Sequence, residues 1–550
     1  MEDIYQLIPD CVFNLSSQFT FDILLQLSTT SKYNSKSIYE LTIHDHDNQP
    51  IYHTSINQIK KFHNIDTLMI SKYYNFHPSM KTNNNLIELT HIKNINFHDE
   101  QQIQYVTKLT HLTSCNFGGM NSISIPYFHT NLSKLYNFRS DKIHNIKNII
   151  GFTHLTYIDV LNNHDDIGVE QFLRFKNLKS LTIPVLSNLS NLSLLISLDT
   201  ISIQNDYLYH HDVFVISHPT VTNIQIYDCT DFDIKNCYEL MYLKLTDSGT
   251  RSLDINSSKL RTLIFGATND DERDVNMDLD IDKCLNLEYF EHLITTKNLT
   301  YLSSRLTKLN SLSFGYGTNI NGDDTVTHNL TSLALYYCPG VFDLNKYRNL
   351  KKLIMCNISH INIDKLIELE YLDCDCNKAD IKRDCINSMN HQKLTYLRLL
   401  NNGVINLNRS NKLNKLLLHY VDEVDIVNIW NNDLKYLCEL TYLHITMKHE
   451  NLLCSEKIFD VSSLLNCVNL KHLECNFLLK NLSLLNKVNH LNICYHKSHL
   501  NIINKLTKLT ALYISSNEKI DKIDVRGLKR LSNFYEYKSN LILPEITMTE

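Results

Sequence analysis

The feature of the sequence that most constrains its fold is a short apolar phrase, L-x-x-L-x-L/I/F, which recurs from one end of the chain to the other. Clear copies begin at Leu155, Leu240, Leu330, Leu394, Leu440 and Leu509. Counted by their first apolar position, 23 copies run from Ile38 to Leu528, with a mean period of about 22 residues. Four consecutive spacings of 23 residues, from Leu86 to Leu178, exclude a coincidence of composition.

The phrase predicts a short strand in every copy. Side chains alternate between the two sides of a strand, so the second and third apolar positions point into the core and the residues flanking the second face solvent. One copy cannot bury its apolar side alone, and stacked copies form a continuous core and a parallel sheet. Units this short leave little room on the far side, where we expect 3₁₀ turns, single-turn helices or extended segments rather than long helices.

One stretch carries an extended form of the pattern, IxxLxxLxxLxIxxNxxIxxI, made by Ile503, Leu506, Leu509, Leu512, Ile514, Asn517, Ile520 and Ile523. This resembles the short, twenty-two-residue class of leucine-rich repeats. The resemblance implies an α/β leucine-rich-repeat solenoid over residues 37–531, a curved parallel sheet of about 23 short repeats, followed by a C-terminal cap and tail at 532–550. Repeats of this family usually have Asn, or Cys as the alternative, at the ninth position. This sequence has Asn there at Asn163, Asn377, Asn402 and Asn517, and Cys at Cys229 and Cys338. Longer units, such as Leu413 to Leu440 and Leu440 to Leu470, should carry insertions.

Residues 1–36 do not fit the repeat. Three phrases in them resemble an F-box: Leu7-Ile8-Pro9-Asp10, Asp22-Ile23-Leu24 and Ser31-Lys32-Tyr33. The segment departs from that family in having Tyr33 for Trp and Phe19 for Leu, and in being one or two residues short. The resemblance implies docking to a Skp1-type adaptor of a cullin ubiquitin ligase through an apolar surface of Pro9, Val12, Leu15, Ile23 and Leu24. The alternative is a helical N-terminal cap over the first repeat, which any solenoid needs.

Motifs of catalysis and of phosphate binding are absent from the sequence. With 12 glycines in 550 residues, it has no GxGxxG or GxxxxGK[ST], and HExxH and GxSxG are missing too. Cys374-x-Cys376 with Cys385 invites a zinc site, but Cys374 occupies a core position of its repeat. The triplet Asp278-x-Asp280-x-Asp282 lacks the glycine of a calcium loop. The 26 histidines do not cluster, which favours surface positions. We therefore expect no enzyme, no metal site and no cofactor.

Charge and cysteine usage indicate a compartment and a class of partner. The net charge is −6, and the composition indicates no basic region that would attract nucleic acid or an anionic membrane. The N-terminus lacks the basic start of a secretory signal, no run reaches the roughly 18 apolar residues of a membrane span, and 15 scattered cysteines fit reduced thiols. Triplets such as Asn329-Leu-Thr331 belong to a repeated NL[ST]xL phrase. We expect a cytoplasmic chain, in a host cytoplasm if the protein is viral. Its Asn-, Ile- and Lys-rich composition resembles repeat proteins of amoebae and their giant viruses.

The positions beside the central apolar residue should line the concave sheet. Tyrosines recur before that residue, and charged residues or histidines follow it. Tyrosine and arginine are enriched among interface hot spots. The residues expected to bind a partner are Tyr371, Asp373, Tyr396, Arg398, Tyr442, His444, His472 and Glu474. Mixed charge favours a protein over nucleic acid as the partner. The alternative is that these tyrosines are duplicated copies that only cover the sheet.

Two functions follow from these patterns. In the first, the chain is the substrate receptor of a ubiquitin ligase, with the N-terminal segment on the adaptor and the solenoid on a protein target. In the second, it is a free-standing protein-binding scaffold without any link to ubiquitin. In both it acts without nucleic acid or membrane and is a monomer outside its complexes.

Overall fold

The computed structural model describes part of the chain, in segments spread along most of its length. The described residues are 40–43, 67–70, 93–96, 111–117, 135–142, 152–162, 169–184, 190–204, 214–229, 232–246, 252–253, 258–266, 278–279, 284–293, 305–315, 329–337, 341–358, 360–363, 365–375, 391–400, 407–448, 455–494, 503, 505–515 and 527–537. They fall into two compact units, an N-terminal unit up to residue 284 and a C-terminal unit from residue 285.

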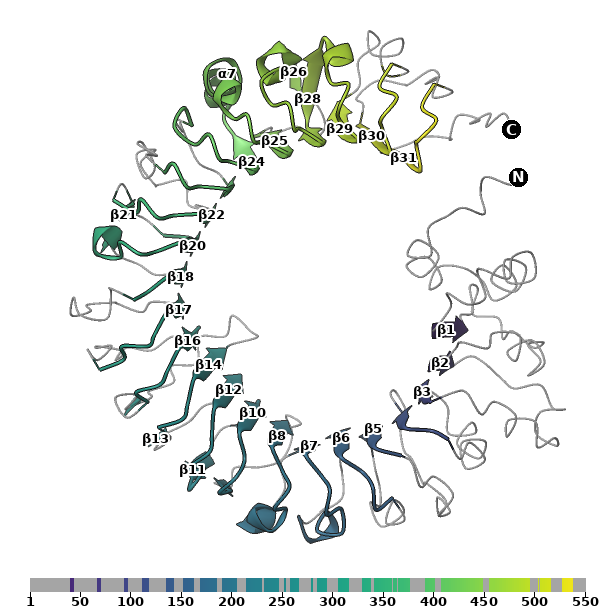
Figure 1. Cartoon of the computed structure of the whole chain (residues 1–550), viewed down its shortest axis with the longest axis vertical. Coiled ribbons are helices and arrows are strands. Elements are labelled where there is room, and N and C mark those ends of the chain that lie inside the picture. Colours follow the sequence, from purple (N-terminus) through teal and green to yellow (C-terminus); the bar gives the residue numbers. More distant parts are fainter. Residues whose placement is uncertain are drawn as a thin grey trace, which may run out of the picture. The chain divides into compact units, whose positions relative to one another are not determined.

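In the N-terminal unit, the described residues form eleven parallel strands, each in register with the next (Figure 1). These are β1 (Glu40–Ile43), β2 (Thr67–Ile70), β3 (Asn94–Asn96), β4 (Ser114–Phe117), β5 (Asn137–Lys142), β6 (Tyr157–Asn162), β7 (Ser180–Pro184), β8 (Thr200–Gln204), β10 (Asn223–Tyr227), β12 (Tyr242–Thr246) and β14 (Thr262–Gly266).

The described part of the C-terminal unit holds twelve strands paired in the same way (Figure 1). They are β16 (Tyr289–His292), β17 (Ser311–Gly315), β18 (Ser332–Tyr336), β20 (Lys352–Cys356), β22 (Tyr371–Asp375), β23 (Tyr396–Leu400), β24 (Lys415–Val421), β25 (Tyr442–Met447), β27 (His472–Cys475), β29 (His490–Cys494), β30 (Ala511–Ser515) and β31 (Asn533–Tyr537). These two sets of described strands, eleven and twelve, make 23, matching the 23 predicted repeats.

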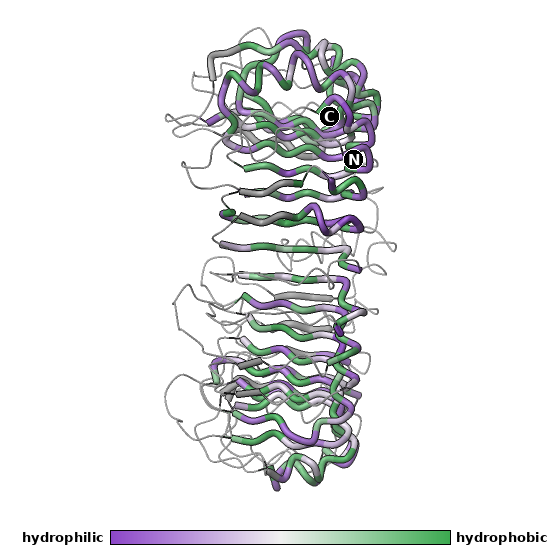
Figure 2. The backbone as a smooth tube through the Cα atoms, turned by 90° about the vertical axis from the view of Figure 1, so that its left-hand side faces the viewer, coloured by the Kyte–Doolittle hydropathy of each residue, from purple (hydrophilic) through white to green (hydrophobic). Residues whose placement is uncertain are grey.

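The alternation of buried and solvent-facing residues confirms the predicted strand geometry. In β12, Leu243 and Leu245 are fully buried, whereas Tyr242 and Lys244 are only half-buried. The first apolar residue of that repeat, Leu240, is buried as well. Figure 2 shows the same apolar stretch recurring from strand to strand. The core is therefore a stack of apolar residues that each repeat supplies in the same order.

The hydroxyl residue that follows the first apolar position of many repeats has a structural role. In several repeats, including the NLTSL copy at Asn329, this hydroxyl donates a hydrogen bond to a backbone carbonyl of the preceding repeat. Thr331 Oγ1 donates to Asn310 O at 3.2 Å, and Thr395 Oγ1 donates to Glu370 O at 3.0 Å. The amides of the same threonines bond the same carbonyls at 2.8 Å. These bonds join consecutive repeats just before their strands begin.

The far side of the repeats carries short elements, as predicted. The 3₁₀ helices there are η6 (Val169–Gln171), η7 (Ser190–Leu194), η10 (Leu344–Lys346), η12 (Leu434–Tyr436), η13 (Val461–Leu464) and η14 (Leu482–Leu484). Extended segments pair as β9 (Phe214–Ser217) with β11 (Phe232–Lys235), β13 (Ser252–Leu253) with β15 (Asp278–Leu279), β19 (Val341–Asp343) with β21 (His360–Asn362), and β26 (Ser455–Asp460) with β28 (Phe477–Lys480). No helix in the described ranges is long and apolar enough to cross a bilayer.

One of the longer repeats carries the insertion that its length predicts. The repeat from Leu413 to Leu440 holds α7 (Glu423–Asn428) and the π-helix η11 (Ile429–Asp433). Trp430, the single tryptophan of the chain, is fully buried there against Phe459 and Phe477.

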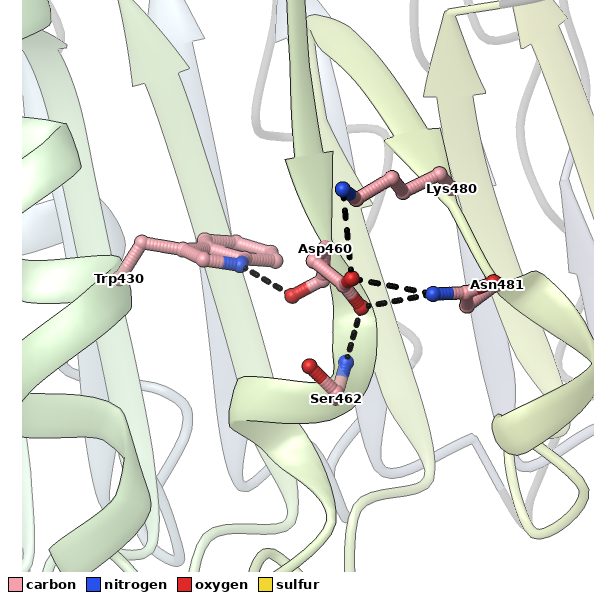
Figure 3. Close-up of polar contacts among 5 residues, drawn as sticks. All are labelled: Trp430, Asp460, Ser462, Lys480 and Asn481. Carbon is pink, nitrogen blue, oxygen red and sulfur yellow. Dashed lines mark hydrogen bonds and ion pairs between the residues drawn. The ribbon is translucent and has the colours of Figure 1, made fainter.

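The next repeat anchors this tryptophan through Asp460, whose backbone carbonyl accepts a hydrogen bond from Trp430 Nε1 at 2.7 Å. The Asp460 carboxylate caps η13 by accepting the Ser462 amide at 2.9 Å (Figure 3). It also accepts Asn481 Nδ2 at 3.0 Å and lies 3.4 Å from Lys480 Nζ. The Ser462 amide and then Asn481 lower the pKa of Asp460 to about 2.

Left-handed residues turn the chain at the ends of several strands. Tyr337 (φ 53°) and Asn357 (φ 54°) directly follow β18 and β20. Their amides donate to the last carbonyl of the next strand, at 2.7 Å from Cys356 O and Asp375 O respectively. Positive φ is costly for residues with a Cβ and least so for Asn and Asp, which stand at four of the six such positions in the described residues.

Some sequence expectations have other outcomes. β31 lies beyond residue 531, so the sheet continues into the segment expected to be a C-terminal cap and tail. Cys494 is disulfide-bonded, which departs from the expectation of reduced thiols throughout. Cys229 is buried and its thiol donates to Tyr227 O at 3.2 Å, whereas Cys338 and the four ninth-position asparagines lie outside the described residues. Residues 1–36 also lie outside them, including Pro9, Val12, Leu15, Ile23 and Leu24.

Candidate functional site

The parallel register of the C-terminal unit aligns equivalent residues of successive repeats into columns. On β20 to β30, the residues before and after the central buried position lie on the same side of the strands. We call this side the open face. The first column, before the central residue, contains Lys352, Tyr371, Tyr396, Lys415, Tyr442, His472 and His490. The second, after it, contains Asp373, Arg398, Leu417, His444, Glu474, Asn492 and Tyr513. All eight predicted partner-binding residues therefore lie on one face.

Two tyrosines of neighbouring strands stack in the first column. The rings of Tyr371 and Tyr396 lie 4.2 Å apart between centroids with an interplanar angle of 4°. Lys352 Nζ lies 5.1 Å from the centroid of the Tyr371 ring, a cation–π contact. Burial, and then a hydrogen bond with Tyr396, raises the pKa of Tyr371. Tyr371 therefore remains neutral at physiological pH, and the two stacked rings are held rigidly by their neighbours.

An ion pair lies beside this stack in the second column. Arg398 Nη1 lies 3.1 Å from Asp373 Oδ1 and 3.4 Å from Asp373 Oδ2. The side chains are 37% and 16% exposed, so the pair is partly shielded from solvent. Burial raises the pKa of nearby Asp375, an effect that Arg398 opposes and Asp373 reinforces. The guanidinium is thus largely neutralised within the face.

Glu474 is the centre of a second group, which we call the Glu474 cluster: Tyr442, His444, Glu474 and His490. Tyr442 Oη donates to Glu474 Oε1 at 3.0 Å, and His444 Nδ1 lies 3.3 Å from Glu474 Oε2. His490 Nε2 approaches Glu474 Oε1 to 3.6 Å. Burial, and then the charge of Glu474, raises the pKa of Tyr442 to about 12. One carboxylate on β27 thereby orders side chains of the two neighbouring strands, β25 and β29.

Further aromatic contacts extend the cluster. The His419 and His444 rings are 4.4 Å apart, His472 lies between Tyr442 and His490 at 5.6 and 5.1 Å, and His490 lies 5.1 Å from Tyr513. Burial, followed by the charges of His444 and Arg398, lowers the pKa of His419 to about 4. Burial also lowers the pKa values of His444 and His472, which Glu474 partly offsets. These three histidines are therefore neutral at physiological pH.

This cluster shows that the expectation of unclustered surface histidines was wrong. His419, His444, His472 and His490 are far apart in sequence, and only the register of the strands makes them neighbours. Other histidines are core residues: His218 is fully buried, with Nδ1 accepting the Val221 amide at 3.1 Å and Nε2 lying 3.3 Å from Leu195 O. Writing the repeats beneath one another would have revealed the columns, and with them the missed residues Lys352, Lys415, His419 and Tyr513.

In the N-terminal unit the equivalent positions are engaged with one another. Tyr157 Oη donates to Asp159 at 3.1 Å, and Arg139 Nε lies 3.3 Å from the same carboxylate. Asp159 is only 5% exposed, although its position predicts a solvent-facing residue. The tyrosine hydroxyl and the guanidinium compensate its desolvation. Here the tyrosine orders an acidic neighbour instead of merely covering the sheet.

The described residues contain no group of three or more histidine, cysteine or acidic side chains that could hold a metal ion. Cys374 is 2% exposed and packs in the core, as its position predicts. Burial raises the pKa values of Cys467 and Cys475 to about 12, so these two thiols are protonated at physiological pH. Cys376 and Cys385 lie outside the described residues. What the open face offers is a rigid surface of aromatic and charged groups.

Comparisons with known proteins bear on the fold alone. No family model matches the sequence, and no curated protein matches it. Among solved structures, the TLR13–ssRNA13 complex matches with a TM-score of 0.51 at 13% identity, over 86% of this chain and 78% of that chain. The circular leucine-rich-repeat protein CroV588 matches with 0.47 at 16% identity, over 92% and 90%. A leucine-rich-repeat protein of Leptospira interrogans matches with 0.41 at 15% identity, over 76% and 98%. The chain is a leucine-rich-repeat solenoid.

Proposed function

We propose that this protein is a non-catalytic protein-binding scaffold whose binding surface is the open face of β20 to β30. The observation that carries the proposal is the pre-ordering of that face. Tyr371 and Tyr396 stack, Arg398 is held by Asp373, and Glu474 fixes side chains of its two neighbouring strands. Side chains that are already ordered lose little conformational entropy when a partner binds.

The composition of the face favours a protein partner. Tyrosine and arginine dominate interface hot spots, and both are central here. Acidic side chains alternate with basic ones across the columns, so the face has no continuous positive stripe that would follow a phosphate backbone. A surface of this kind recognises a partner by complementary charges and aromatic contacts.

A peptide-display selection on the full chain tests this proposal. Random peptides that bind the chain would be retested on a face variant, Tyr371→Ala/Tyr396→Ala/Arg398→Glu. The matched control is Tyr238→Ala/Tyr436→Ala, because those two tyrosines are 59% and 46% exposed and lie off the open face. We expect selected peptides to lose binding to the face variant and keep it on the control. Peptides that bind all three proteins equally would refute the proposal.

A finer proposal is that the scaffold is the substrate receptor of a Skp1/cullin ubiquitin ligase in the cytoplasm. Its support is the F-box-like phrasing of residues 7–33, which lie outside the described residues. Co-purification of the chain with a Skp1-type adaptor tests it. Binding by the intact chain, and its loss in a folded Pro9→Ala/Leu15→Asp variant, is the supporting result. Absence of binding by the intact chain would leave the segment as a cap.

A further inference from the structure

The first column of the open face points to the chemistry of the partner. We propose that Lys352, Tyr371, Tyr396 and Lys415, which we call the lysine–tyrosine column, bind an extended acidic segment of a protein. Two carboxylates of that segment, four residues apart, would lie at Lys352 and Lys415. The inference rests on the proposed function, because it specifies what the open face holds.

The charges of the open face make this column its anion-binding part. Lys352 and Lys415 are exposed, and within the described residues no acidic side chain pairs with either ammonium group. Lysines elsewhere in the unit do have acidic partners, such as Lys351 with Glu370 and Lys393 with Glu368.

The other ionised groups of the face have partners of their own. Arg398 is paired with Asp373, and Glu474 is engaged by Tyr442, His444 and His490. The charge of Arg398 also acts on Asp375, where it opposes the rise in pKa that burial causes. The two lysines are therefore the positive charges that remain for a partner to neutralise.

The spacing of the two lysines favours an extended partner. Lys352, Tyr371, Tyr396 and Lys415 stand on four consecutive strands in register. Three strand spacings amount to about 14 Å. In an extended chain, residues i and i+4 are also about 14 Å apart and point to the same side. Two carboxylates at that separation can therefore lie over both lysines at once, with the tyrosine pair between them.

The contacts of the Tyr371 ring favour a carboxylate over a nucleobase as its partner. One face of the Tyr371 ring is covered by Tyr396 and the other by the Lys352 ammonium group. A nucleobase would need an uncovered ring face on which to stack. The ring edges, which carry the positive end of the aromatic quadrupole, remain available to an anion. The Tyr371 hydroxyl is neutral because its pKa is raised, so it does not repel the same carboxylates.

Fluorescein-labelled peptides of about twelve residues provide a direct test on the full chain. One peptide carries two aspartates four positions apart, an isomer carries them side by side, and a third carries asparagines. We expect the first to bind about tenfold more tightly than the isomer, and more weakly as salt rises. Equal affinity of the two isomers would overturn the proposed geometry, because their net charges are the same.

Charge-reversal variants locate the site. Lys352→Glu/Lys415→Glu should weaken the first peptide about tenfold or more. The matched control is Lys505→Glu/Lys508→Glu, two exposed lysines in the turn before β30, and it should bind as the native chain does. Equal losses in the two variants would show a general charge effect and overturn the proposal.

Failure of this inference is distinguishable from failure of the proposed function. One outcome is that display-selected peptides depend on Tyr371 and Arg398 and yet contain no acidic pair. In that case the open face is still the binding surface, but the lysine–tyrosine column does not bind acidic segments. If no selected peptide responds to face variants, the proposed function itself fails. A uridine oligomer that binds the native chain and loses binding in the Lys352→Glu/Lys415→Glu variant, while the peptides do not bind, would replace the acidic peptide with nucleic acid.

Discussion

Removing the Asp460 carboxylate should destabilise the insertion around Trp430 by about 2 kcal/mol. An N-cap side chain contributes about 1 kcal/mol, and the bond from Asn481 adds about 1 kcal/mol. The pairing with Lys480 adds little, because the Lys480 side chain is 58% exposed. Asp460→Ala loses all of these interactions, whereas Asp460→Asn keeps an oxygen that can accept the Ser462 amide and should lose about half as much.

The single tryptophan makes the effect measurable. Trp430 is buried and its indole N–H donates to the Asp460 carbonyl, so its fluorescence reports the structure next to the substitution. Urea unfolding followed by this fluorescence should show a lower midpoint for Asp460→Ala. The control is Glu439→Ala, an exposed carboxylate in the same unit, which should leave the midpoint unchanged. Equal midpoints for Asp460→Ala and the control would refute the reasoning.

The pH dependence of this stabilisation follows from the sign of the pKa shift. The pKa of Asp460 is lowered to about 2 in the folded chain, against about 3.9 when unfolded. The charged form is therefore favoured by folding, and its stabilisation is fully present above pH 4 and lost as pH falls towards 2. The difference between the native chain and Asp460→Asn should shrink over that window. A difference that stays constant from pH 6 to pH 2.5 would show that the charge of Asp460 does not contribute.

Three other substitutions test the core, a strand-end turn and the Glu474 cluster. Leu443→Ala, at a fully buried core position, should lower the free energy of unfolding by about 3 kcal/mol in a urea titration; a loss below 1 kcal/mol would contradict continuous packing. Asn357→Ala should cost about 1 kcal/mol because φ is 54°, and Asn357→Gly less, so equal losses would exclude backbone strain as the cause. Glu474→Gln should lower the pKa of Tyr442 below about 12 in an ultraviolet titration, because the charge that raises it is removed; an unchanged pKa would leave burial as the sole cause.

The placement of strands and core residues was predictable because it depends on local spacing. The alternation of Leu240, Leu243 and Leu245 puts these residues in the core whichever repeat they stack upon. The short far-side elements follow from repeat length, and the length of the Leu413–Leu440 repeat correctly indicated the insertion that holds α7. The internal structure of that insertion was not predictable, because the Asp460 interactions join residues of two different repeats.

The sequence by itself determined a leucine-rich-repeat solenoid and the face on which its solvent-facing tyrosines lie. Both depend on the alternation of apolar and polar residues within each short repeat. Only the tertiary structure decided which side chains became partners. Register brings Tyr371 onto Tyr396, and Glu474 within reach of His444 and His490, although each pair is separated by 16 to 30 residues of chain. It also leaves Lys352 and Lys415 without acidic partners in the described part of the chain. The physical reason is that strand stacking, and not proximity along the chain, sets the neighbours of every residue on the sheet.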